Sequence, residues 1–379
     1  MLANMATKFS KKHSQAFGNH IKTLRMARNI GQRKLAKAIG ISPSYLNDIE
    51  NNNRYPQKKE LIKKIAYVLE ANLDNLYDLA GKAKNKIPPD IPDIIKKNKE
   101  IPSLMRTINM YGLTSMEIKE IRRKIEEEHM KAIVIAAGMG NRLMPYTNDL
   151  PKCMLEFGGK TLFQRQIDAF KACKVKNIVA IKGYKEEKIS YPGIKYYFND
   201  NYKNNNILNS LFYAEEEIKG GVIISYSDIL FEKQVVERLL ESKMDISIVV
   251  DIDWRGYYEN RKDHPIEEAE NVIFDAENNV VEIGKILAKK HDVHGEFIGM
   301  MKLTERGSEI FKRHFNRSKK LFWGKPFQRA STFEKAYLTD IIQEMVDLGV
   351  PIHCVIIKRG WKEIDTVEDY KKAIKEFED

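Results

Sequence analysis

A short apolar segment followed by a glycine-containing loop constrains the fold of this chain more than any other stretch. Residues 132–137 form a run rich in β-branched residues, which is typical of a buried parallel strand. The loop at residues 138–142 contains two glycines, which allow positive φ angles and let the backbone approach a ligand closely. Because Arg142 ends this loop, its guanidinium and the backbone N–H groups predict an anion-binding site. A tight turn with surface cations is the alternative for the loop alone.

The residues that follow supply a second cation and a family resemblance. Lys152 comes after Pro151, and two cations beside a glycine loop suit a triphosphate. The pattern A-A-G-x-G-x-R-L-x-P-x-T, followed by P-K-x-M-L and G-G-K-x-L, resembles the opening of the nucleotidyltransferases that activate sugar phosphates and phosphocholine. Asn141 departs from it, because those enzymes more often have Ser or Thr there. The resemblance implies a nucleotide-binding loop and two catalytic cations, namely Ala137, Gly138, Gly140, Asn141, Arg142 and Lys152.

Length and cysteine content limit the class of protein. A chain of 379 residues is long enough for two domains, and it contains no apolar run near the ~20 residues that span a bilayer. Residues 1–15 lack the apolar core of a signal peptide, so we expect a soluble, cytoplasmic protein. The three cysteines are too few and too irregularly spaced to indicate disulfides or a zinc site.

The excess positive charge lies in the N-terminal third of the chain. Residues 1–130 hold 25 Lys and Arg against 14 Asp and Glu, whereas 39 basic and 39 acidic residues balance in the remainder. The whole net charge of +11 therefore falls in this third. Such an asymmetry favours an acidic partner, with nucleic acid as the first candidate, and a solvated basic face as the alternative.

Residues 1–84 predict an all-α bundle. Apolar spacing favours helices over residues 17–26, 32–39, 43–50, 59–69 and 73–80. The string Q-x-x-L-A-x-x-x-G-I-S-x-x-Y-L-x-x-I-E, which starts at Gln32, resembles the phage-repressor-like family of helix-turn-helix domains. The resemblance implies that the partner is double-stranded DNA, although a domain kept for protein contacts is the alternative. The implied major-groove residues are Ser42, Ser44, Tyr45 and Asn47, and those implied near phosphates are Gln32, Arg33 and Arg54.

Residues 85–129 are expected to connect two domains. The proline-rich stretch at 86–92 predicts a hinge, and residues 103–128 predict helix with a break near Gly112. Apolar stripes on this helical stretch favour packing against a neighbour. Since phage-repressor-like domains commonly act as dimers on two half-sites, we expect a homodimer.

Residues 130–379 predict a doubly wound, Rossmann-like α/β domain. A strand at 132–137, a helix at 161–173 and a strand at 177–181 follow the doubly wound plan, which places ligands at the carboxyl ends of strands. Lys182 ends the second of these strands and is expected to bind the nucleotide. Further strands are expected at 195–198, 221–225, 245–250, 280–284, 295–299 and 350–357.

Three more segments indicate the nucleotide and the metal. Residues 204–211 resemble an asparagine-rich segment of the phosphocholine cytidylyltransferase branch, which implies CTP as the nucleotide with Asn205 and Ser210 beside it. Asp228 ends a buried strand and is predicted to bind Mg²⁺, which takes hard oxygen ligands. Ser227 precedes it, where those enzymes more often have Gly, and is expected near the nucleotide. The string E-I-D-T-x-x-D-Y resembles the end of these enzymes and implies Asp365 as the second Mg²⁺ ligand.

The segment D-x-D-W…R-x-x-H-P-x-x-E-A-E resembles nucleotidyltransferases associated with phosphonate biosynthesis. It implies an acceptor site in which Arg261 and His264 hold a phosphate or phosphonate and the carboxylates hold an amine. A loop or capping role is the alternative for His264. The expected acceptor-binding residues are Asp253, Arg261, His264, Glu268, Glu270, Glu296 and Tyr337.

The implied reaction is nucleotidyl transfer. An anionic oxygen of the acceptor attacks the α-phosphorus of CTP and pyrophosphate leaves, so the site must neutralise and align two anions. No general base is needed, because the acceptor oxygen is already ionised near pH 7. A sugar-1-phosphate nucleotidylyltransferase is the alternative enzyme. A transcriptional regulator whose C-terminal domain only senses nucleotide or product is the alternative from another class.

Overall fold

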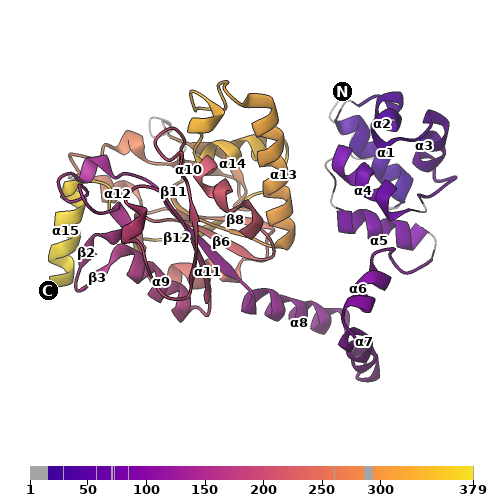
Figure 1. Cartoon of the computed structure of the whole chain (residues 1–379), viewed down its shortest axis with the longest axis horizontal. Helices are drawn as coiled ribbons and strands as arrows, with labels where there is room; N and C mark the ends of the chain where they lie inside the picture. Colours follow the sequence, from indigo (N-terminus) through magenta and orange to yellow (C-terminus); the bar gives the residue numbers. More distant parts are fainter. Residues whose placement is uncertain are drawn as a thin grey trace. The chain divides into compact units, whose positions relative to one another are not determined.

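The computed structural model describes residues 16–28, 30–56, 58–69, 71, 73–83, 85–259, 261–285 and 293–378 (Figure 1). Contacts divide the chain into two compact units, Met1–Ile118 and Lys119–Asp379. Residues 1–15, to which the expectation about a signal peptide refers, lie outside the described residues. Within the described ranges, no helix is both long enough and apolar enough to cross a membrane.

The first unit contains the predicted helical bundle, and all five expected helices are confirmed. They are α1 (Phe17–Ala27), α2 (Gln32–Ile39), α3 (Pro43–Glu50), α4 (Lys59–Val68) and α5 (Leu73–Ala83). Helix α2 ends at Gly40, whose φ of 75° is a left-handed conformation that glycine adopts without strain. The Ser42 side chain then caps α3 by accepting a hydrogen bond from the Tyr45 N–H at 3.1 Å. This helix, glycine turn and capped helix form the helix-turn-helix.

Three further helices follow, namely α6 (Ile91–Lys97), α7 (Glu100–Met110) and α8 (Ser115–Glu128). Helix α6 begins inside the stretch for which a hinge was predicted, whereas residues 86–90 lie between α5 and α6 outside any helix. Pro92 falls in the first turn of α6, where the missing N–H group has no helical partner to lose. The predicted break near Gly112 is confirmed, since this residue has a φ of 60°. Helices α7 and α8 contain no buried residue.

The second unit is built on a nine-stranded mixed sheet. Its parallel part has the order β6 (Val222–Tyr226), β1 (Lys131–Ala136), β4 (Asn177–Lys182) and β5 (Ile194–Phe198). The chain runs outward from β1 to β4 and β5, and then returns to place β6 on the other side of β1. Such a reversal of strand order opens a crevice at the carboxyl ends of the strands. The doubly wound plan is therefore confirmed.

The remaining strands extend this sheet in a mixed pattern. They are β8 (Ile246–Asp251), β9 (Asn271–Phe274), β10 (Val280–Gly284), β11 (Gly295–Leu303) and β12 (His353–Ile357). Strand β11 pairs antiparallel with β9 through its first residues and with β6 through its last, and its register with β8 shifts between Phe297 and Met301. Gly299 lies within this shift with a φ of +80°, so the Tyr226 ring can pack against its backbone.

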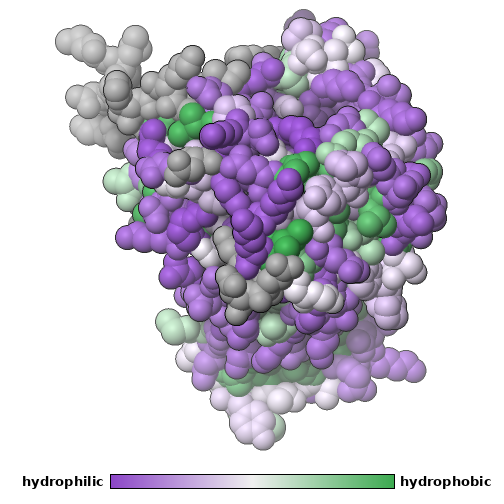
Figure 2. All heavy atoms as spheres, turned by 90° about the vertical axis from the view of Figure 1, so that its left-hand side faces the viewer, coloured by the Kyte–Doolittle hydropathy of each residue, from purple (hydrophilic) through white to green (hydrophobic). Residues whose placement is uncertain are grey.

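Helices cover both faces of the sheet. The side chains of β1 accordingly alternate between two hydrophobic clusters, one on each face. On one face α9 (Leu162–Ala172), α11 (Lys233–Glu241) and α15 (Val367–Glu378) contribute to the cluster, and on the other α10 (Ile207–Leu211), α13 (Glu305–Phe322) and α14 (Leu338–Asp347) do so (Figure 1). Hydrophilic side chains dominate the molecular face in Figure 2. The smaller elements are α12 (Arg255–Tyr258), the hairpin of β2 (Glu156–Phe157) with β3 (Lys160–Thr161), and the antiparallel pair of β7 (Ile229–Phe231) with β13 (Trp361–Glu363).

Replacing Gly299 with Ala is expected to lower the free energy of unfolding by roughly 1–3 kcal/mol, because the new methyl group would overpack the core. A Cβ at this position would lie 2.3 Å from a ring atom of Tyr226. The Gly349→Ala variant is the matched control, since Gly349 has a φ of +77° but open space around it. Urea unfolding followed by tryptophan fluorescence reports on the second unit, which contains all three tryptophans. Equal destabilisation by both substitutions would contradict the packing argument.

Candidate active site

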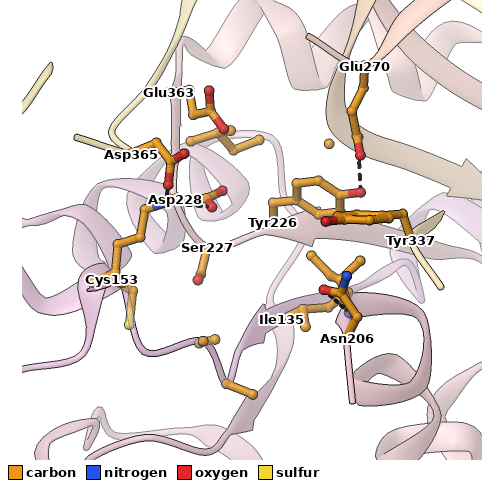
Figure 3. Close-up of a pocket in the computed structure, with 18 of the residues that line it drawn as sticks. Ile135, Cys153, Asn206, Tyr226, Ser227, Asp228, Glu270, Tyr337, Glu363 and Asp365 are labelled. Carbon is orange, nitrogen blue, oxygen red and sulfur yellow. Dashed lines mark hydrogen bonds and ion pairs between the residues drawn. The ribbon is translucent and has the colours of Figure 1, made fainter. Parts of the chain in front are cut away.

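A cavity of about 540 Å³ lies at the carboxyl ends of β1 and β6, in the crevice that the strand order creates (Figure 3). The residues that line it come from segments far apart in the sequence. They include most of those predicted for the enzyme site, namely Ala137, Gly138, Gly140, Asn141, Arg142, Lys152, Asn205, Ser210, Ser227, Asp228, His264, Glu268, Glu270, Glu296, Tyr337 and Asp365.

The glycine loop forms one wall of this cavity. Gly140 has a left-handed conformation, with φ 64° and ψ 40°, and precedes the 3₁₀ turn η2 (Asn141–Leu143). A Cβ at Gly140 would lie 3.1 Å from the Cβ of Lys152, so the close approach of these two segments favours glycine. The Thr147 hydroxyl donates a hydrogen bond to the Gly140 carbonyl at 2.8 Å. The loop is thus fixed with bare backbone facing the cavity.

Four charged side chains meet beside this loop. The Lys152 Nζ lies 2.9 Å from Asp228 Oδ2 and also donates to Asp365 Oδ1, and Arg142 forms an ion pair with Asp365. Burial alone would lower the pKa of Lys152, but Asp228 and Asp365 raise it above its ordinary value. Burial alone would raise the pKa of Asp365, but Lys152 lowers it. The two predicted metal ligands therefore belong to one cluster, in which Lys152 and Asp365 are both charged.

Glu363 is a residue of this cluster that the sequence reasoning missed. Its Oε2 lies 3.6 Å from His264 Nδ1, which is also 3.5 Å from Asp365 Oδ2. One ligand atom from each of these three side chains lies within 4.8 Å of the others, close enough for a shared metal ion. Burial and the neighbouring carboxylates raise the pKa of Glu363. The sequence did hold a signal, because residues two apart in an extended segment project to the same side.

The opposite end of the cavity combines aromatic rings with a carboxylate. Figure 3 shows Tyr226, Tyr337 and Glu270 gathered there, away from Asp228 and Asp365. The Tyr226 hydroxyl donates to Glu270 Oε2 at 3.2 Å. Burial raises the pKa of Glu270 to about 7. The sequence pointed to Tyr337 and Glu270 here but not to Tyr226, which became visible as a lining residue only once β6 and β11 were placed side by side.

Two further groups complete this end. The Lys285 Nζ lies 2.9 Å from Glu268 Oε2 and 4.8 Å from the centroid of the Tyr337 ring, so this lysine faces the cavity. Glu296 accepts a hydrogen bond from the Tyr258 hydroxyl, and burial raises the pKa of Glu296 to about 8. This end of the site is therefore rich in acids, and two of them hold a proton more readily than usual.

Three predicted residues lie elsewhere, and the structure corrects their expected roles. Lys182 does not line the cavity. Its Nζ pairs with Glu186 at 2.7 Å and lies over the Tyr196 ring, so it is not placed beside the nucleotide. Asp253 and Arg261 line a second cavity of about 460 Å³ instead of the first. The Arg261 guanidinium donates to both carboxylate oxygens of Asp369, at 2.8 and 2.9 Å, which leaves the expected acceptor anion no place there.

The residues predicted to contact DNA lie on and around α2 and α3 of the first unit. Five of them have exposed side chains, namely Arg33, Ser42, Ser44, Asn47 and Arg54. Gln32 is half-buried, since its amide donates to the buried carboxylate of Glu50 at 3.0 Å. Tyr45 is also half-buried, and its ring lies 5.9 Å from the Arg54 guanidinium carbon. Gln32 and Tyr45 therefore also shape the surface on which the five exposed residues lie.

Comparison with known proteins identifies both domains. The MobA-like NTP transferase domain family matches residues 132–272, and the helix-turn-helix family matches residues 21–76. The chain therefore contains a nucleotidyltransferase domain and a helix-turn-helix domain. A CTP:phosphoglutamine cytidylyltransferase of Campylobacter jejuni is 28% identical over 257 residues, covering 65% of this chain and 99% of that protein. A choline-phosphate cytidylyltransferase of Streptococcus pneumoniae is 34% identical over 117 residues, covering 30% and 51% respectively.

A solved structure agrees with the fold of the nucleotidyltransferase domain. The inositol-1-phosphate CTP transferase from T. maritima aligns with a TM-score of 0.51 and 22% identity, covering 66% of this chain and 97% of that one. At this level of identity the likeness concerns the fold alone.

The acids of the nucleotidyltransferase domain fit a hard divalent cation, which prefers carboxylate oxygens. Asp228 Oδ1 is buried with no hydrogen-bond partner among the described residues, although its Oδ2 is paired with Lys152. A buried carboxylate oxygen without a partner is costly unless another group satisfies it. Asp365 and Glu363 supply further oxygens within the same cluster.

The buried acid Glu296 predicts a distinctive dependence of stability on pH. Its pKa is about 8 in the folded protein against 4.5 for the ordinary group. Between these values the folded state binds more protons, so wild-type stability falls as pH rises, by up to about 1.4 kcal/mol per pH unit from this residue. The Glu296→Gln variant lacks this loss. In urea unfolding, the free energy of unfolding of Glu296→Gln should therefore rise relative to that of the wild type from pH 5 to 8. The free energy of unfolding of the exposed control, Glu241→Gln, should follow that of the wild type throughout.

Proposed function

We propose that the nucleotidyltransferase domain is a Mg²⁺-dependent cytidylyltransferase that uses CTP to activate a phosphate or phosphonate acceptor and releases pyrophosphate. The observation that carries this proposal is the cluster of Lys152, Asp228 and Asp365 beside the glycine loop. It joins a cation suited to a phosphoryl group with two acids suited to a metal, at the point where a doubly wound sheet binds ligands.

CTP is supported by two observations. Both relatives described above are named as cytidylyltransferases. In this chain the buried amide of Asn199 donates to Asn205 Oδ1 at 3.0 Å and to Ser210 Oγ at 2.8 Å. Asn205 and Ser210 both line the cavity, so this network holds two polar groups in fixed orientations. Fixed hydrogen-bonding groups of this kind suit recognition of the edge of a base.

The residues of the chain divide the work of aligning two anions. Backbone N–H groups of residues 138–142 and the Arg142 guanidinium bind the β- and γ-phosphates. Lys152 stabilises the negative charge that builds up around the α-phosphorus. Mg²⁺ held by Asp228 and Asp365 would supply further neutralisation of the triphosphate and the acceptor. When the nucleotide enters, Lys152 can exchange a carboxylate partner for a phosphate oxygen without leaving the cluster.

The acceptor is a phosphate or phosphonate that carries a cationic group, such as an amine or a quaternary ammonium. Tyr226 and Tyr337 offer ring faces at the far end of the cavity, and Glu270 and Glu296 offer carboxylates. Aromatic faces and carboxylates attract a cation in a site from which water is excluded. Burial favours the protonated forms of these two acids, and a bound cation would favour the ionised forms instead. This end of the cavity therefore suits a cationic group of the acceptor better than a neutral one.

Activity measurements test the catalytic proposal. Pyrophosphate release should be measured with CTP and Mg²⁺ against amine-bearing phosphonates, phosphocholine and sugar 1-phosphates. The Lys152→Met variant is expected to lose roughly 10²–10³ in kcat, as enzymes do when one charge-stabilising donor is removed. Lys160→Met is the control, because Lys160 is exposed and its ammonium group pairs with Asp168 on the protein surface. Tight binding of CTP without turnover of any acceptor would favour a sensor over an enzyme.

We further propose that the helix-turn-helix domain binds double-stranded DNA as part of a homodimer, in the cytoplasm. The exposed residues of α2 and α3 and the excess positive charge of residues 1–130 support a DNA partner. The exposed Ile118, Ile121 and Ile125 of α8 support a dimer, since they recur at helical spacing with no cover among the described residues.

Binding to genomic fragments is expected to weaken steeply as salt rises, because cations are released from each neutralised phosphate. Fluorescence anisotropy measures this slope, and native mass spectrometry should find two chains per bound duplex. Asn47→Ala should lower the difference in binding free energy between the genomic fragment that binds most tightly and unrelated DNA by about 1–3 kcal/mol, which is the usual contribution of one base contact. Lys371→Ala, in the other domain, serves as the control. A complete lack of binding at low salt would instead favour a role in protein contacts.

A further inference from the structure

The segment 361–365, which begins with β13 and contains the acids Glu363 and Asp365, separates the two cavities. Trp361, Glu363 and Asp365 line the first cavity, whereas Lys362 and Ile364 line the second. Successive side chains of an extended segment project to opposite sides, which explains this alternation. The acids are therefore held from behind by groups that face the second cavity.

Asp369 is the first of these groups. Its Oδ2 accepts hydrogen bonds from the backbone N–H of Thr366 at 3.0 Å and from the Thr366 hydroxyl at 2.9 Å, with a longer contact of 3.3 Å from the Asp365 N–H. Arg261 binds the same carboxylate through Nε and Nη2. The side chains of Arg261 and Asp369 are only 2% and 3% exposed. A bidentate contact between two buried side chains fixes the orientation of the carboxylate as well as its distance from the guanidinium.

Tyr257 provides a second link between Arg261 and the acids. Its hydroxyl donates to the Glu363 carbonyl at 3.0 Å and accepts from the Glu363 N–H at 3.2 Å. Its ring lies between the guanidinium groups of Arg261 and Arg359, each 4.4 Å from the ring centroid. The Arg261 Nη2 also lies 3.5 Å from Glu363 Oε2. Arg261 thus contacts both Tyr257, which hydrogen-bonds the backbone of Glu363, and Asp369, which accepts from the backbone of Asp365 and Thr366.

We infer that Arg261 and Asp369 are positioning residues that hold Asp365 and Glu363 in the arrangement that binds the divalent cation. This inference rests on the proposed function only in assigning a cation to Asp365. A buried ion pair is weak support for stability, because burial of two charges offsets their attraction. A pair that orients ligand-bearing residues nevertheless changes metal affinity, typically by 10–100-fold. Lysine cannot replace the planar fork of arginine in this geometry.

The second cavity offers a way to test this role. Arg261 lines it, so removal of the side chain in Arg261→Ala leaves a space that a small planar cation can enter from solution. Added guanidinium at about 50 mM can refill that space and is far below the molar concentrations that unfold proteins. Restoration of function by guanidinium would distinguish a positioning role from a general loss of folding.

The experiment measures Mn²⁺ binding to the full chain by electron paramagnetic resonance, without nucleotide. Arg261→Ala, Arg261→Lys and Asp369→Asn are expected to weaken Mn²⁺ binding about tenfold or more. Guanidinium should restore binding in Arg261→Ala alone. Arg359→Ala is the matched control, because Arg359 stacks on the same tyrosine ring but pairs with Asp251 instead of Asp369. It should bind Mn²⁺ like the wild type.

Wild-type affinity in folded Arg261→Lys and Asp369→Asn would overturn the positioning role and leave the proposed function intact. Equal loss in Arg359→Ala would also overturn it, since disturbed stacking on Tyr257 would then suffice. Asp365→Asn is the reference for the site itself. If this substitution leaves Mn²⁺ binding unchanged, the assignment of the cation to Asp365 is wrong, and the proposed function fails together with the inference built on it.

Discussion

The contact of Lys152 with both Asp228 and Asp365 is the interaction on which the arrangement of the site depends. Two carboxylates held close together in a poorly solvated cavity would repel each other, and one of them would take up a proton. Lys152 removes this repulsion, because its Nζ lies 2.9 Å from Asp228 and also binds Asp365. Three segments that are far apart in the sequence are thereby joined, and Lys152 holds the pKa of Asp365 below its ordinary value.

The sheet makes this contact possible by its order of strands. Strand β1 leads into the glycine loop, and β6 leads to Asp228. Because the two strands are parallel neighbours at the switch point, the loop and Asp228 lie at the same edge of the sheet. The antiparallel strands serve a different purpose. The register shift in β11 places Gly299 against Tyr226, and β9 follows directly after Glu270 in the chain. The parallel part of the sheet thus builds the glycine-loop end of the cavity, and the antiparallel part builds the acid-rich end.

The sequence was a good guide to elements and to loops, and a poorer guide to the direction of single side chains. Local apolar spacing predicted the five helices of the first unit and eight of the nine strands of the main sheet, since both signals are local, but it missed β9. Arg261 was misplaced because the partner that holds it depends on tertiary structure, whereas the partner of Lys182, Glu186, lies only four residues later in the chain. Arg261 is bound by Asp369, 108 residues later in the chain, and no local pattern contains that pairing. Glu363 was overlooked although its spacing from Asp365 already placed both side chains on one side.

The charges that line the cavity link the metal to the acceptor. Six acids, namely Asp228, Glu268, Glu270, Glu296, Glu363 and Asp365, face Arg142, Lys152 and Lys285. Burial raises the pKa values of Glu270, Glu296 and Glu363, which reduces the negative charge, but three cations among six acids still leave no large excess of positive charge to attract a bare triphosphate and a second anion together. Each anion must therefore arrive with positive charge of its own. A divalent cation satisfies this requirement for the nucleotide, and a cationic substituent satisfies it for the acceptor. Phosphates of uncharged sugars lack that cationic substituent, so the acid-rich end would disfavour them as acceptors.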